Sequence, residues 1–174
     1  MRLVVSVLAV SLVCVAFCPV PSAFAHDENL VLTFDDYTAQ TGSHEDADPF
    51  KGWLNLTVTN NMEEAWGDIH FQIKDVGWDV TSVGFVVDSP YEPTSSQSPL
   101  TWMVDNVSPE ATLDLFFYTD PVLPGETATF SVYTDNTTDQ APFFGWCIYP
   151  TPVPEPASLA LLALGGLLVA RRRR

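Results

Sequence analysis

Residues that could bind a cation gather between positions 44 and 48, where the sequence reads His-Glu-Asp-Ala-Asp. Calcium takes about six to eight oxygen ligands, so the carboxylates of Glu45, Asp46 and Asp48 are chemically suitable donors. The glycine-punctuated spacing of an EF-hand loop is absent, and a chain this acidic produces such clusters by chance. We therefore expect a solvated acidic loop here and keep calcium as the alternative.

Other metal and catalytic chemistry has less support in the sequence. A zinc site needs several histidine or cysteine ligands, and His26, His44 and His70 lie far apart along the chain. His70 falls on the polar face of a predicted strand, where we expect it to meet solvent. Neither a serine nucleophile elbow nor a His-Glu-x-x-His motif occurs. A glycosidase needs only two carboxylates, and the many candidates here neither support nor exclude one. We expect no cofactor and no enzyme, with a small glycan-acting enzyme as the alternative.

Aromatic side chains offer a different chemistry, that of stacking on sugar rings. Four tryptophans fall outside the predicted strand cores: Trp53, Trp66, Trp78 and Trp102. Together they could form a carbohydrate-binding platform. The alternative is a structural or interaction protein of the extracellular matrix, which the sequence favours.

The carboxyl-terminal residues read as a processing signal in three parts. Val153, Pro154, Glu155 and Pro156 form a stiff tetrapeptide, because each proline fixes its φ angle and restricts the residue before it. Residues 157–170 carry no charge and would span about 21 Å as a helix, which is short for a hydrocarbon core of about 30 Å. The final four arginines would stay cytoplasmic; they are Arg171, Arg172, Arg173 and Arg174.

This arrangement resembles the PEP-CTERM sorting domain of Gram-negative bacteria over residues 153–174. The resemblance implies processing by an exosortase, a membrane-embedded cysteine transpeptidase that cleaves near the motif. It also implies delivery to the outer surface or extracellular matrix, where exopolysaccharide is a possible partner. A plain tail anchor and a buried apolar helix are the alternatives.

The amino terminus has the three regions of a secretory signal peptide. Arg2 precedes an apolar run, and the small residues Ala23 and Ala25 suit cleavage by signal peptidase before His26. An uncleaved anchor is the alternative. The predicted organisation is a signal peptide at 1–25, an ectodomain at 26–152 and the sorting domain at 153–174.

Charge separates these parts of the chain. The whole sequence has a formal charge of −15, but residues 26–152 hold only two lysines against 21 acidic residues, a formal −19. Such a surface repels nucleic acid and anionic lipid. Of the three cysteines only Cys147 lies outside the signal peptide, so we expect it to be buried as a small apolar residue.

Alternation of apolar and polar residues dominates the ectodomain and predicts strands. A polar loop is predicted at 38–48, and a proline-rich loop at 89–99 that cannot lie inside a sheet. Seven or eight short strands separated by turns indicate an antiparallel β-sandwich. A signal helix and a transmembrane helix would flank it in the precursor. The predicted strands are 30–34, 54–58, 69–73, 83–87, 113–117, 127–133 and 144–148.

Overall fold

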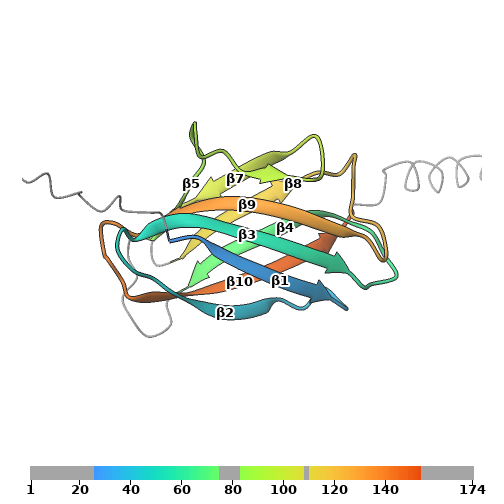
Figure 1. Cartoon of the computed structure of the whole chain (residues 1–174). Helices are drawn as coiled ribbons and strands as arrows, with labels where there is room; N and C mark the ends of the chain where they lie inside the picture. Colours follow the sequence, from blue (N-terminus) through green and yellow to red (C-terminus); the bar gives the residue numbers. More distant parts are fainter. Residues whose placement is uncertain (1–25, 75–82, 108–109, 154–174) are drawn as a thin grey trace, which may run out of the picture.

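The structure is a computed structural model, and it describes residues 26–74, 83–107 and 110–153. This part of the chain forms ten strands in two facing sheets (Figure 1). The strands are β1 (Glu28–Phe34), β2 (Gln40–Glu45), β3 (Lys51–Asn60), β4 (Trp66–Lys74), β5 (Gly84–Val86), β6 (Thr94–Ser95), β7 (Thr101–Asp105), β8 (Ala111–Phe116), β9 (Thr127–Asp135) and β10 (Phe143–Pro152).

The first sheet has the order β1-β3-β9-β5, with the short strand β6 also paired to β9. The second sheet has the order β2-β10-β4-β8-β7. All pairings are antiparallel except that of β1 with β3, which is parallel. The prediction of a mainly β protein is confirmed. The prediction that the sandwich is antiparallel was wrong for one pair, β1 with β3. After β1 the chain crosses to the second sheet as β2 and returns as β3, the long connection that parallel neighbours need.

The core lies between the sheets and follows from the alternation in the sequence. Leu56 and Val58 of β3 face Ile69 and Phe71 of β4, and all four are almost completely buried. Trp66 is fully buried, and its ring meets the edges of aromatic rings from both sides of the core. Those partners are Phe34 and Phe117, while Phe130 lies tilted against Trp66.

Strand β2 occupies the region predicted as a polar loop, so that prediction was wrong. Its sequence Gln-Thr-Gly-Ser-His-Glu has no apolar alternation, because β2 is an edge strand whose backbone pairs with β10. Edge pairing needs backbone hydrogen bonds but little apolar surface. The structure also adds β6 and β7; β6 lies within the proline-rich loop but at the margin of its sheet.

Two buried asparagines fasten the loops at opposite ends of the sandwich. Asn60 ends β3 and donates to the carbonyl oxygens of Glu64 and Val122, both at 2.9 Å. Asn136 follows β9 and donates to the carbonyl oxygen of Ala141 at 2.8 Å. Because buried polar groups are costly unless they are hydrogen-bonded, these contacts fix both ends of the fold.

The predicted signal helix and transmembrane helix both lie outside the described residues. Within 26–74, 83–107 and 110–153 there is no helix of the length and hydropathy that crossing a membrane requires.

Trp66 gives a direct test of this core. Replacing it with alanine removes a fully buried ring and leaves a cavity, so Trp66→Ala should lower the free energy of unfolding by about 3–5 kcal/mol. Val31→Thr is the control, since Val31 is 77% exposed, and it should change that energy by less than about 0.5 kcal/mol. Urea denaturation followed by circular dichroism measures both. Equal effects would contradict the assigned core.

Candidate functional site

An open groove of about 510 Å³ lies on the outer face of the first sheet. Trp53 and Asn55 of β3 and Ser131 of β9 form its floor, because these residues alternate with the inward-facing core positions. Its remaining lining comes from the segment before β1, from the loop between β5 and β6, and from the start of β6. Those lining residues are Asp27, Pro90, Glu92 and Thr94.

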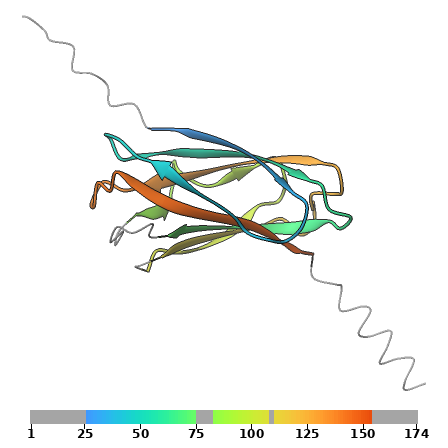
Figure 2. The same cartoon turned by 90° about the horizontal axis from the view of Figure 1, so that it is seen from below.

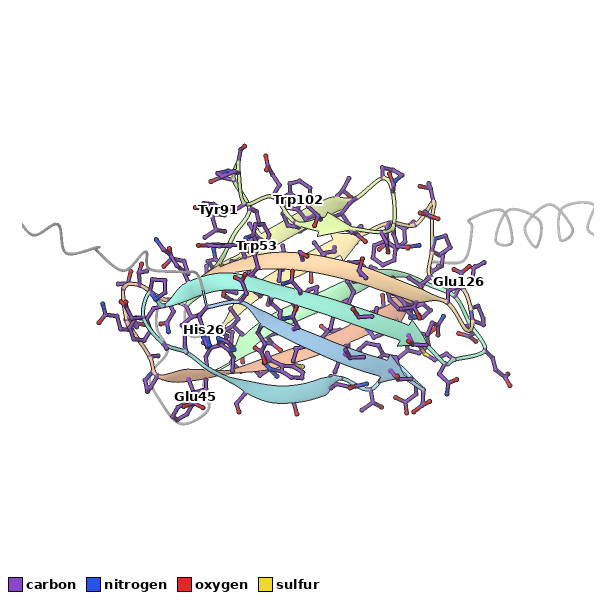
Figure 3. All side chains as sticks on the ribbon, in the orientation of Figure 1. His26, Glu45, Trp53, Tyr91, Trp102 and Glu126 are labelled. Carbon is purple, nitrogen blue, oxygen red and sulfur yellow. The ribbon has the colours of Figure 1, made fainter. Side chains whose placement is uncertain are left out.

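Three aromatic rings meet beside this groove. Tyr91 stacks on Tyr133 with the ring centres 4.2 Å apart, and Trp53 meets Tyr133 edge-on at 5.2 Å. Figure 3 shows Trp53 and Tyr91 close together above β9. Burial, followed by the neighbouring Tyr91, raises the pKa of Tyr133. The rings support one another, so Trp53 is held in place while remaining partly open to solvent.

Hydrogen-bonding groups line the groove next to these rings. Ser131 Oγ donates to Asn55 Oδ1 at 2.8 Å, so within the described part of the chain the amide nitrogen of Asn55 is available as a donor. Asp27 Oδ1 accepts from the Trp53 backbone nitrogen at 2.9 Å, and this contact fixes the start of the chain beside the ring. A partly exposed aromatic face beside amide, hydroxyl and carboxylate groups can recognise a ligand with both apolar and polar faces.

The structure separates the four tryptophans that were predicted to form a platform. Only Trp53 lies on the groove. Trp66 is in the core, so its prediction as a surface residue was wrong. Trp102 lies half-buried against the core from β7 in the other sheet. Trp78 is outside the described residues. Tyr91 and Tyr133, which the sequence analysis missed, join Trp53 instead.

The acidic residues considered for calcium also lie apart in the structure. Asp46 is buried near His26 and His44, whereas Glu45 and Asp48 are exposed and do not belong to that group. Histidine and aspartate at positions 44 and 46 share one side of the chain because they are two residues apart in extended structure. The prediction of a solvated loop was therefore wrong for His44 and Asp46.

His70 lies in a polar network on the outer face of the second sheet rather than facing solvent freely. Its Nδ1 donates to Asp114 Oδ1 at 2.6 Å, and its ring stacks on Tyr149 with centres 4.8 Å apart. Its Nε2 lies 3.5 Å from Asp68 Oδ1. Asp68 is buried and accepts hydrogen bonds from the hydroxyls of Tyr118 at 2.9 Å and Thr151 at 2.6 Å.

The protonation equilibria of this network favour the charged forms of both partners. Burial alone would lower the pKa of His70, but the carboxylates of Asp68 and Asp114 beside its ring nitrogens outweigh it, so that pKa is raised. Burial alone would raise the pKa of Asp68, but the nearby His70 ring and the hydrogen bonds from Thr151 and Tyr118 hold it below its usual range. Burial and the bond to Asp68 raise the pKa of Tyr118 to about 12.

Cys147 is buried as a free thiol, as predicted. The residues of the predicted processing sites fall mainly beyond the described part of the chain. His26 and Val153 are described, whereas Ala23, Ala25, Pro154, Glu155, Pro156 and Arg171 to Arg174 lie outside it.

Comparison with known families decides the reading of the carboxyl terminus. The model of the PEP-CTERM protein-sorting motif matches residues 152–174. The chain carries a PEP-CTERM sorting signal. This signal implies an exported protein that an exosortase processes, directed to the cell envelope or surface of a Gram-negative bacterium. Comparison with curated proteins and with solved structures gives no match.

The His70 network predicts how stability depends on pH. Because the pKa of His70 is raised in the folded state, protonated His70 stabilises the fold below about pH 6.5. This stabilisation is lost as the pH rises through the pKa of His70 in the folded protein. Because the pKa of Asp68 is lowered in the folded state, ionised Asp68 stabilises the fold above about pH 3.9. This stabilisation is lost as the pH falls below that value and through the pKa of Asp68 in the folded protein. Melting temperatures should therefore be highest between these limits. His70→Gln should flatten the alkaline decline, and an unchanged decline would contradict the network.

Proposed function

We propose that this protein is a non-catalytic component of the cell surface or extracellular matrix that binds exopolysaccharide through the groove at Trp53. The groove is the observation that carries the proposal, since it combines a supported aromatic face with polar groups on an exported β-sandwich. The sorting signal supports it further, because proteins that resemble this one in their tails tend to occur where extracellular polysaccharide is made.

The chemistry of the groove selects among polysaccharides. One face of a sugar ring presents C–H groups that can lie on Trp53, and its hydroxyls can bond to Asn55 and Thr94. Asp27 and Glu92 place carboxylates at the same groove, and the ectodomain has a formal charge of −19. Anionic polymers would be repelled by this surface. The preferred ligand is thus a neutral polysaccharide.

The groove lies at the end of the sandwich opposite the start of the carboxyl-terminal sorting signal. Trp53 lies near the start of β3, beside Tyr133 and the loop after β9. Val153 follows β10 at the other end of the sandwich, where Pro152 pairs with Trp66. Figure 2 shows the described chain entering at one end and leaving at the opposite end. A molecule held by its carboxyl-terminal end would present the groove away from the attachment.

In this proposal the network at His70 has a structural role. Among the described residues, neither ring nitrogen of His70 is hydrogen-bonded to a hydroxyl or thiol, and both face carboxylates. The hydroxyls of Tyr118 and Thr151 donate to Asp68 instead. The histidine is therefore placed to hold two strands together rather than to activate a nucleophile.

Affinity electrophoresis of the processed protein tests the proposal. Migration should be retarded in gels that contain the host's neutral exopolysaccharide or a neutral β-glucan, and not in gels that contain alginate. Trp53→Ala should weaken binding by about thirtyfold or more, because losing a central aromatic contact costs about 2 kcal/mol or more.

Trp102→Ala is the matched control, because it removes the same side chain from the other sheet. It should leave retardation unchanged, and thermal melts should show that both variants remain folded. Asn55→Ala gives a second variant within the groove. Equal retardation of wild type and Trp53→Ala, or a preference for alginate, would contradict the proposal.

A further inference from the structure

Two histidines and an aspartate meet at the edge where the two sheets approach each other. His26 Nδ1 lies 3.7 Å from Asp46 Oδ1, and His44 Nε2 lies 3.9 Å from the same oxygen. One ligand atom from each residue falls within 4.8 Å of the others. Two ligands that are each about 2.1 Å from one ion lie about 3–4 Å apart. The two distances to Asp46 are thus too long for hydrogen bonds and suit a shared ion.

The surrounding contacts orient these groups. Glu28 on β1 binds His44 Nδ1, which leaves Nε2 directed toward Asp46. Asn136 donates to Asp46 Oδ2 at 2.8 Å, while Oδ1 is the oxygen nearest both histidines. A carboxylate on the outer nitrogen of a histidine is the usual support for a metal ligand, since it fixes the tautomer and raises basicity.

Burial gives an independent reason for a cation here. The side chain of Asp46 is 4% exposed and that of His44 is 11% exposed. A buried carboxylate is costly unless a positive partner compensates it. Asp46 Oδ1 accepts a hydrogen bond from the Ala47 backbone nitrogen at 2.9 Å, but within the described residues its only cationic neighbours are the two histidines, at distances beyond direct hydrogen bonding. A divalent ion would compensate Asp46 and Glu28 together.

The backbone of His26 is built into the fold at this point. Its nitrogen donates to the Lys51 carbonyl oxygen at 3.0 Å. Gly52 makes this approach possible, because a Cβ at that position would lie 2.2 Å from the His26 carbonyl oxygen. In Figure 3 His26 lies beside the start of β1. The histidine is thus held in register by the strand next to it.

We propose that His26, His44 and Asp46 bind a divalent transition-metal ion, with Cu(II) held most tightly. Two imidazoles suit copper, zinc and nickel, and Cu(II) leads the affinity order for such ligands. Calcium prefers oxygen ligands alone. Cleavage before His26, which the sequence predicts, frees an α-amino group that can close a chelate ring with Nδ1 of the same residue. This proposal is independent of the polysaccharide groove.

Metal titration of the processed protein tests the site. Protein released by an exosortase-carrying host is stripped with a chelator and titrated with copper or zinc chloride by calorimetry. One equivalent of either ion should bind, copper more tightly, and each should raise the melting temperature as linkage requires. The Cu(II) paramagnetic resonance spectrum should show coupling to nitrogen. Failure to bind either ion, or binding without nitrogen coupling, would overturn the proposal.

Variants separate this site from adventitious binding. Glu28→Gln removes the residue that supports His44 and should weaken copper binding by about 10- to 100-fold. His26→Gln and His44→Gln each remove a ligand and should weaken copper binding by more than Glu28→Gln does. His26 is the safer substitution because its side chain is 42% exposed. His70→Gln is the matched control and should bind normally. Unchanged affinity in folded His26→Gln would overturn the assignment.

One further variant tests the amino group. Inserting a serine between Ala25 and His26 moves the new terminus one residue away while retaining all three side chains. Copper affinity should fall at least tenfold, whereas zinc affinity should change less. Equal copper affinity would overturn the role of the amino group.

Discussion

Burial of the apolar faces of both sheets against each other is the constraint on which this structure depends. Trp66 fills that core between Phe34 and Phe117 at the end of the sandwich where β10 finishes. Side chains alternate along β3, and along β4 once the register has shifted between Trp66 and Asp68, so fixing the inward positions Leu56, Ile69 and Phe71 also fixes the outward ones. Trp53 and Asn55 must then face outward on β3, and Asp68 and His70 outward on β4. The groove and the His70 network both follow from one core.

The period-two pattern was enough to predict the strands that line the core. It did not reveal β2, whose residues Gln40–Glu45 pair through their backbone at an edge. Nor did it reveal the parallel neighbours β1 and β3, because pairing depends on where the crossover returns. Trp66 was misplaced because it begins its strand, where no alternation yet marks the inner face.

The grouping of His26, His44 and Asp46 shows why sequence distance is a poor guide to a site. The first residue precedes β1 in one sheet, and the others lie in and after β2 in the other. Only the crossover between the sheets brings them together. Tyr91 and Tyr133 were missed for the same reason, since one lies in a loop and the other on β9. The sorting tail, by contrast, is contiguous and could be recognised directly.

Mass spectrometry of the extracellular protein from its native host tests the central claim, that this chain is a precursor whose β-sandwich is delivered alone. The released form should begin at His26 and lack every peptide from 159 to 174. Glu155→Ala should leave the intact tail in the inner membrane, because the carboxylate between the prolines is lost. Recovery of Arg174 on the extracellular form, or normal release of that variant, would contradict the account.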